Sequence, residues 1–218
     1  CGIPCKMPSE PTTIERDAMP PATLEFWLDF GSNYSYLSAM RIEALAREKQ
    51  VHVIWKPFLL GVVFKALGWE TSPFVLQKLK GDYTWRDMAR QCEKYGLPWR
   101  QPGAFPRTAL LPMRVALIGA DQGWIAPFAR RMMTMNFAAD RDIDNIAAVS
   151  EALEELGLDA RAILALALTQ DNKQRLRRQT QQAQALNLFG APSFIIDGEL
   201  FWGNDRLDDA LAHAAASA

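Results

Sequence analysis

Histidine and cysteine are scarce in this sequence. Its 218 residues include two histidines, His52 and His213, and three cysteines. A Ser-His-acid triad or a multi-histidine metal site would have to be built around one of these two histidines, so we interpret both as structural or surface residues and expect no metal site. Cys1 and Cys5 lie in a polar N-terminal segment and Cys92 in an expected helix, so no Cys-x-x-Cys pair occurs. The sequence therefore lacks the reagent of disulfide exchange.

An excess of charge of one sign is also missing. The 24 basic and 25 acidic residues give a net charge of -1, and they are well mixed, which argues against binding to nucleic acid or to a membrane surface. No apolar stretch reaches the roughly 20 residues of a membrane-spanning helix, and the N-terminal segment lacks a basic-then-apolar signal pattern. We therefore expect a globular cytoplasmic protein, with enough hydrophobic residues for a substantial core.

Residues 1–23 form an expected N-terminal tail with no role in the fold. The segment CGIPCKMPSEPTTIERDAMPP is polar and rich in proline. Because the given chain starts without methionine, three origins stay open for this tail: an expression remnant, a trimmed natural tail or a lipoprotein terminus.

A strand, a turn, a helix and a second strand are expected after this tail. From about residue 23, apolar residues recur with the two-residue period of a strand, until Gly31 ends the run. Beyond the turn, apolar residues fall at helical spacing, and Ser32 to Ser35 supply capping candidates. The segment VHVIWKPF predicts a second strand, which Pro57 ends because proline cannot donate to a sheet. The simplest interpretation is a βαβ unit.

The rest of the chain divides into a helical block and a short β-rich end. From about Val62 to Leu188, capping residues, good helix formers and glycine stops predict helices. Two β-rich runs then flank Asp197-Gly198, which is a strong hairpin signal, and a helix is expected from Asn204.

This order of elements predicts an α/β protein with a thioredoxin-like fold and a large all-helical insertion domain. We expect the thioredoxin-like domain to comprise residues 24–61 and 189–218. The helical insertion domain would comprise residues 62–188.

Four motifs connect the sequence to a known family. FGSNYSYL, WKPFLLGVVFKALG, KGDYTWRDMAR and GAPSFIIDGELFWGNDRL occur in this order, and the order is more specific than any single motif. The chain resembles the 2-hydroxychromene-2-carboxylate isomerase family, relatives of kappa-class glutathione transferases and, more distantly, of periplasmic DsbA-like disulfide oxidoreductases. The resemblance covers nearly everything from Leu24 to His213.

Ser32 is the residue for which this resemblance matters most. Taken alone, a serine before a helix is interpreted as an N-cap. The resemblance implies that Ser32 stands where redox enzymes of the thioredoxin fold keep their attacking cysteine. Its hydroxyl would donate a hydrogen bond to the thiolate of bound glutathione, and the helix dipole would help to lower the pKa of that thiol. Many relatives carry Ser-Pro here, whereas this sequence has Asn33, which removes the rigidity of proline.

The resemblance implies further contacts with glutathione near the C-terminus. Ala191-Pro192 would be a cis peptide whose backbone pairs with the cysteinyl part of glutathione, although an ordinary X-Pro bond is trans. Asn204 and Asp205 would receive the γ-glutamyl end, with Asp205 as the firmer assignment. From the residues alone, both also fit an ordinary helix cap.

Two lysines and three aromatic residues complete the candidate site. The resemblance implies that Lys80 reaches the glycyl carboxylate of glutathione, with Lys78 as a rival, although a lysine is mostly an exposed surface residue. Lys56 would meet a substrate carboxylate or extend into water. Three aromatic side chains could line a substrate pocket, unless they belong to the core: Tyr34, Tyr83 and Trp202.

The function implied by the resemblance is a glutathione-dependent isomerase in aromatic compound catabolism. It would interconvert 2-hydroxychromene-2-carboxylate and trans-o-hydroxybenzylidenepyruvate through reversible addition of the glutathione thiolate, without a metal. Relatives imply a homodimer. The alternatives are a kappa-like glutathione transferase or peroxidase and a noncatalytic thioredoxin-like module that binds thiol peptides.

Overall fold

One mixed sheet of four strands organises the molecule. The computed structural model describes residues 22–217. The strand order is β2-β1-β3-β4. β1 pairs in parallel with β2, whereas the β1–β3 and β3–β4 pairs are antiparallel. The strands span Thr23–Leu28 (β1), His52–Pro57 (β2), Ser193–Ile196 (β3) and Glu199–Trp202 (β4).

Helices make up most of the remaining structure. The helices before β3 are α1 (Asn33–Glu48), α2 (Leu60–Ala66), α3 (Pro73–Leu76), α4 (Lys78–Tyr95), α5 (Leu110–Gln122), α6 (Ile125–Phe137), α7 (Ile146–Glu155), α8 (Ala160–Ala167) and α9 (Gln170–Ala185). After β4 come the short 3₁₀ helix η1 (Asn204–Arg206) and α10 (Leu207–Ala216). Within residues 22–217, no helix combines the length and apolarity that crossing a membrane requires.

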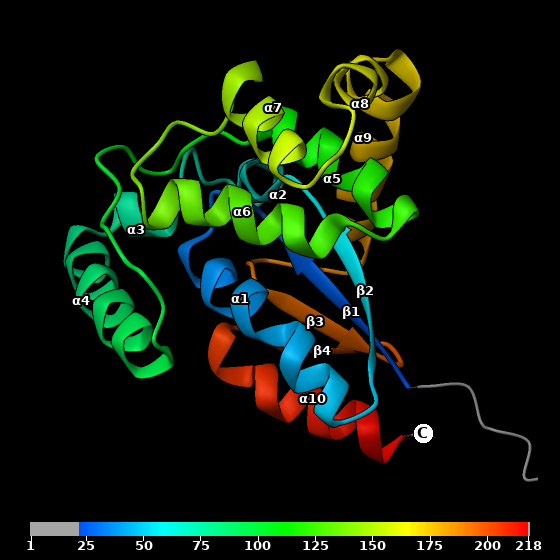
Figure 1. Ribbon diagram of the computed structural model, residues 1–218. Helices are drawn as coiled ribbons and strands as arrows, with labels where there is room; N and C mark the ends of the chain where they lie inside the picture. Colours follow the sequence, from blue (N-terminus) through cyan, green and yellow to red (C-terminus); the bar gives the residue numbers. More distant parts are fainter. Residues whose placement is uncertain (1–21, 218) are drawn as a thin grey trace, which may run out of the picture.

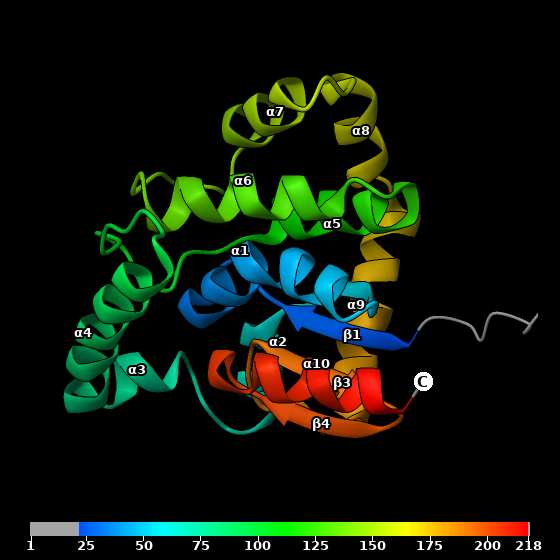
Figure 2. The same cartoon turned by 60° about the horizontal axis from the view of Figure 1, so that its bottom comes forward.

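Both faces of the sheet are covered. On one face, Leu24, Phe26 and Leu28 belong to the main hydrophobic core, to which α1 and α10 contribute. On the other face, Trp27 packs in a second cluster with Phe58 and with residues of α2 and α9. Figures 1 and 2 show α1 and α10 on one side of the strands and α9 on the other. β1 is therefore a central strand that is covered on both faces.

The helices between β2 and β3 surround the sheet rather than extend it. α6 lies along α1, and α5 contacts both α6 and β2. α3 and α4 stand at one side of the molecule in both views, while α7 and α8 lie at the end farthest from α10 (Figures 1 and 2). The result is an edge at which the start of α1 faces the arm formed by α3 and α4.

The structure confirms the predicted fold. β1 and β2 form one sheet with β3 and β4, as the order of the β-rich segments predicts. Asp197 and Gly198 both have positive φ at the hairpin turn, the conformation that this pair favours. One detail is different: the helix expected from Asn204 begins as η1, and its regular part starts at Leu207. Of the expected N-terminal tail, residues 1–21, including Cys1 and Cys5, lie outside the described residues, whereas Thr23 already belongs to β1.

Candidate functional site

Ser32 occupies the start of α1 and also reaches a distant loop. Its Oγ accepts a hydrogen bond from the amide of Ser35 at 3.2 Å, which makes it the N-cap of the helix. The same hydroxyl donates to the carbonyl of Ala191 at 2.8 Å. The side chain is buried, with 7% of the residue's surface exposed. Ser32 is therefore both an N-cap and a contact between two segments that are far apart in the sequence.

The turn before Ser32 is held by a buried carboxylate and by close packing. Asp29 accepts hydrogen bonds from the amides of Gly31 at 2.7 Å and Leu60 at 2.8 Å. Burial raises the pKa of Asp29, while these two amide bonds act in the opposite direction. A side chain at Gly31 would meet the carbonyl oxygen of Arg107 at 2.7 Å. Glycine is required there because the two backbones approach so closely.

A polar network supports the same turn from α6. The Arg107 guanidinium donates to Oδ1 of Asn136 at 2.9 Å and forms an ion pair with Asp140. Nδ2 of Asn136 donates in turn to the carbonyl of Phe30 at 3.0 Å. The bond from Arg107 holds the pKa of Asp140 below its usual range, with help from an amide bond. The start of α1 is thus fixed from two directions.

The loop before β3 brings a third segment to Ser32. The Ala191-Pro192 peptide is cis, as the resemblance implies. The carbonyl of Pro192 accepts a hydrogen bond from the amide of Gly203 at 3.0 Å. Gly203 directly precedes η1, which carries Asn204 and Asp205. Ser32, the cis peptide and the start of η1 therefore lie in one continuous chain of contacts.

Asn204 and Asp205, the first two residues of η1, have different surroundings. Asn204 is buried, and its Oδ1 accepts from the hydroxyl of Ser38 at 3.1 Å and from Arg41 at 3.3 Å. Its side-chain oxygen is therefore bonded to α1. Asp205 is exposed, with Arg206 as an ion-pair partner at 3.1 Å. Ligand contacts of both residues stay predictions, and Asp205 has the more accessible side chain.

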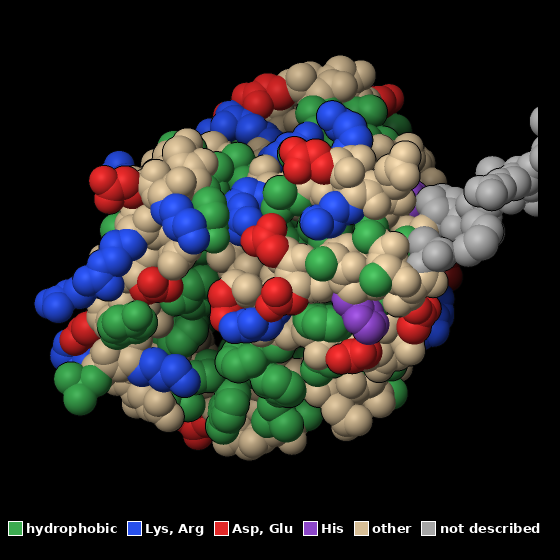
Figure 3. Space-filling model, turned by 90° about the horizontal axis from the view of Figure 1, so that it is seen from below, with side chains coloured by type: hydrophobic (Ala, Val, Ile, Leu, Met, Phe, Trp, Pro, Cys, Tyr) green, Lys and Arg blue, Asp and Glu red, His purple; other side chains and the backbone are tan. Residues whose placement is uncertain are grey.

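Tyr34 connects α1 to the α3–α4 arm. Its hydroxyl donates to Oδ2 of Asp87 on α4 at 2.7 Å. Burial, and then this bond to Asp87, raise the pKa of Tyr34. Lys80 and Tyr83 lie on α4 and are exposed to solvent. Figure 3, which views the molecule from below, shows a hollow on the face between the α4 side and the α10 side, with hydrophobic and charged side chains around it.

Two further predicted residues already have partners of their own. Lys56 forms an ion pair with Glu25 at 3.4 Å and lies over the ring of Trp27, on the sheet face opposite α1. A role in binding a substrate carboxylate would require that pair to open. Trp202 is half-exposed at the end of β4, where its ring contacts that of Phe189 at a centroid distance of 4.9 Å. Both roles stay predictions.

Residues that the sequence did not single out also shape the site. Asp29 was visible only as a charged residue in an otherwise apolar run, and Arg107 and Asn136 had no sequence signal. The sequence marks Asn33 as a departure from the family, but not as a donor. In the structure it is almost completely buried, and its Nδ2 has no hydrogen-bond partner among the described residues. Such a buried donor needs an acceptor, because leaving it unpaired costs free energy.

Comparisons with known proteins place this geometry in a family. A family model for the DsbA-like thioredoxin domain matches residues 23–215. The chain belongs to this family. It is also 28% identical, over 189 residues, to a 2-hydroxychromene-2-carboxylate isomerase from Sphingobium xenophagum, a match that covers 85% of this chain and 94% of the relative.

Solved structures show the same fold. A 2-hydroxychromene-2-carboxylate isomerase has a TM-score of 0.80 at 24% identity, with 89% of this chain and 95% of that chain covered. The cytosolic disulfide reductase DsbM from Pseudomonas aeruginosa, solved with GSH, has a TM-score of 0.61 at 16% identity, with 89% and 96% covered. The first of these likenesses is the stronger over nearly the same span.

This DsbA-like domain has no cysteine at the start of α1. The described part of the chain contains one cysteine, Cys92, which is buried in α4. Burial raises the pKa of its thiol to about 11, so it is mostly protonated at neutral pH. The site described above is therefore built around the Ser32 hydroxyl and backbone groups, and it provides no thiolate from the described residues.

Proposed function

We propose that this protein is a glutathione-dependent isomerase of 2-hydroxychromene-2-carboxylate-type aromatic substrates, which it interconverts with trans-o-hydroxybenzylidenepyruvate. The observation that carries the proposal is the position of Ser32. Its hydroxyl caps α1 and touches the cis Ala191-Pro192 loop, in a chain similar to proteins that are named for this reaction. A serine there can hold a thiolate but cannot form a disulfide.

The residues around Ser32 fit glutathione. The first-turn amides of a helix have no intrahelical acceptor, so α1 offers N–H donors at its positive end. Nδ2 of Asn33 is a further buried donor, without a partner among the described residues. Together with the Ser32 hydroxyl, these donors suit an anionic sulfur. Support also comes from DsbM, whose fold is similar and whose structure was solved with GSH.

The two ends of glutathione would be held by different segments. Asp205, with backbone groups of Asn204, would receive the γ-glutamyl end, and the backbone of Ala191 and Pro192 would pair with its cysteinyl part. Lys80 on the α3–α4 arm would reach the glycyl carboxylate. In support of this assignment, the Tyr34–Asp87 bond ties the arm that carries Lys80 to α1.

Glutathione, when bound, would supply the thiol that adds reversibly to the conjugated side chain of the substrate. The protein's own task is electrostatic. The Ser32 hydroxyl turns from the Ala191 carbonyl toward the sulfur, and with the α1 amides it lowers the pKa of the thiol and stabilises negative charge. Tyr34, Tyr83 and Trp202 would border the aromatic ring of the substrate. Lys56 could bind its carboxylate once the pair with Glu25 opens.

We place the activity in the cytoplasm, in the catabolism of aromatic compounds, and assign it to a homodimer. Gel filtration at several protein concentrations tests the last point, because a dimer elutes at twice the mass of the chain.

An absorbance assay tests the proposed reaction. Turnover of 2-hydroxychromene-2-carboxylate should require added glutathione and should be strongly reduced by Ser32→Ala. A reaction that proceeds equally well without glutathione would exclude the proposed cofactor. Conjugation of glutathione to an electrophile such as 1-chloro-2,4-dinitrobenzene, with no isomerisation, would instead identify a transferase.

A further inference from the structure

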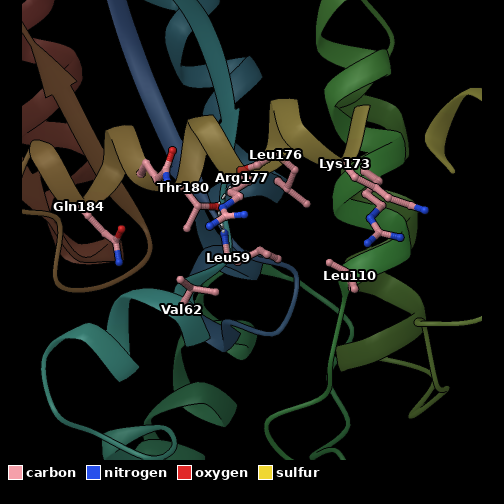
Figure 4. Close-up of a pocket in the computed structure, with 10 residues that line it drawn as sticks. Leu59, Val62, Leu110, Lys173, Leu176, Arg177, Thr180 and Gln184 are labelled. Carbon is pink, nitrogen blue, oxygen red and sulfur yellow. Dashed lines mark hydrogen bonds between the residues drawn. The ribbon is translucent and has the colours of Figure 1, made fainter. Parts of the chain in front are cut away.

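A cavity of about 350 Å³ lies away from Ser32, between α2, α5 and α9 (Figure 4). None of the residues predicted for the Ser32 site lines it. Figure 4 shows Lys173 and Leu110 at one end of the cavity and Gln184 at the other, with Arg177 between α9 and Leu59. Its aliphatic lining consists of Leu59, Val62, Leu110 and Leu176, and its polar lining of Arg114, Lys173, Arg177, Thr180, Gln181 and Gln184.

The charges of this lining have one sign. Three cations, Arg114, Lys173 and Arg177, contribute to it, and no aspartate or glutamate does. None of the three forms an ion pair within residues 22–217. In addition, Nε of Arg114 is buried and has no hydrogen-bond partner there. A buried cationic donor without an acceptor is costly, so an anion in this cavity would be stabilised.

The cavity is separated from Ser32 by bonded backbone. Leu59, in its wall, donates its amide to Thr180 Oγ1 at 3.1 Å. The next amide, that of Leu60, donates to Asp29, which also holds Gly31. The wall of the cavity is thus bonded, through Leu60 and Asp29, to the turn that precedes Ser32. A ligand in the cavity would not occupy the place proposed for glutathione.

We propose that this cavity binds a compact amphipathic carboxylate with one or two rings. The aliphatic lining would contact the ring body, and the guanidinium groups would bind the carboxylate, for which their planar fork is well suited. The volume lies near the lower end of about 300 to 1,000 Å³ that small-molecule pockets span, which suits a compact body. The inference does not rest on the proposed function, since neither glutathione nor Ser32 takes part.

Calorimetry with 1-naphthoate tests this site in the full chain. We expect one site in the wild-type protein, and binding at least about tenfold weaker in Arg114→Met and in Arg177→Met, because each loses a charge-assisted hydrogen bond. Arg161→Met is the matched control, since Arg161 is exposed on α8 and does not line the cavity. It should bind naphthoate like the wild type. The neutral analogue 1-naphthalenemethanol should bind at least about tenfold more weakly than naphthoate.

A second variant keeps the test independent of the arginines. Val62 is 43% exposed, so Val62→Trp can fill the cavity from its rim without disturbing the core, and it should abolish naphthoate binding. Ser32→Ala and saturating glutathione should leave binding unchanged. Absence of binding at millimolar naphthoate, wild-type affinity in both arginine variants, or displacement by glutathione would each overturn the proposal. Tighter binding of octanoate than of naphthoate would overturn the assignment to a ringed carboxylate.

Discussion

The starts of α1 and α9 are alike in their local bonding and differ in what surrounds them. Both helices have 16 residues, and both are capped by a hydroxyl that accepts from an amide in the first turn. Ser32 donates to Ala191, which is 159 residues away, whereas Thr169 donates to Leu166, three residues away. Ser32 is buried beneath a loop, and Thr169 is exposed. An N-cap is therefore ordinary, and what distinguishes Ser32 is the distant segment brought to it.

Replacing the two capping hydroxyls should give the largest contrast in activity. Ser32→Ala should lower glutathione-dependent turnover by about 10²-fold or more, the scale of removing one oxyanion donor. Thr169→Ala removes the same two kinds of hydrogen bond and should leave turnover unchanged. Each variant should lose about 1 kcal/mol of stability, as expected for a cap. Turnover is measured by absorbance and stability by urea unfolding. Equal turnover in the two variants would show that Ser32 is only an N-cap and has no role in the reaction.

A smaller effect is expected where the turn before Ser32 approaches its neighbour. Gly31→Ala would place a methyl group 2.7 Å from the Arg107 carbonyl, and such overpacking should cost about 1 to 3 kcal/mol. Gly61 in α2 is a matched control, because a side chain there meets nothing within 4 Å. Gly61→Ala should be neutral or stabilising, by up to about 1 kcal/mol. Chemical denaturation of both variants measures the difference. An unchanged midpoint for Gly31→Ala would show that the turn can move.

The sequence predicted local structure better than contacts between residues that are far apart in the chain. The two-residue period located β1 and its end at the turn, because strand periodicity is a local pattern. It indicated one apolar stripe, yet Trp27 on the opposite face is equally buried, since helices cover both sides of the strand. Asn204 was predicted to meet glutathione, but its side-chain oxygen bonds to Ser38, 166 residues earlier. No local pattern encodes such a pairing.

The Ser32 site could be predicted only as far as the motifs specify it. The resemblance pointed to Ser32 and to a cis Ala191-Pro192, and the structure brings the two together. The support from Arg107 and Asn136 was missed, because an arginine in a loop and an asparagine in a helix are common on surfaces. Their significance arises only when the fold places them under the start of α1.

Glutathione affinity should depend more on Asp205 than on Lys80, the two charged residues predicted to bind the ends of glutathione. Asp205→Ala should weaken binding by about tenfold, the loss of one charge-assisted hydrogen bond. Lys80 is on the exposed side of the α3–α4 arm, so Lys80→Ala should cost less than about fivefold. Calorimetry with Thr169→Ala as the reference gives the ranking. Unchanged affinity in both variants would contradict the assignment of glutathione to this site.

The smallest expected effect concerns the ion pair that supports the start of α1. Arg107 holds the pKa of Asp140 below its usual value, so the folded state binds this proton less readily than the unfolded state. The resulting stability is complete above the ordinary pKa and is lost as the pH falls through the lowered value. Asp140→Asn should therefore reduce the melting temperature at neutral pH by a few degrees, and the difference should shrink in acid.

Asp197→Asn is the matched control for this pH dependence. Asp140 and Asp197 both have positive φ, at 54° and 50°, which asparagine tolerates equally well. Among the described residues, Asp197 has no arginine partner, so its replacement should leave the pH profile of the melting temperature unchanged. If Asp140→Asn also left the pH profile of the melting temperature unchanged, the ion pair with Arg107 would add nothing to the support of Ser32. Asn136, through its bond to the Phe30 carbonyl, would then support the start of α1 without it.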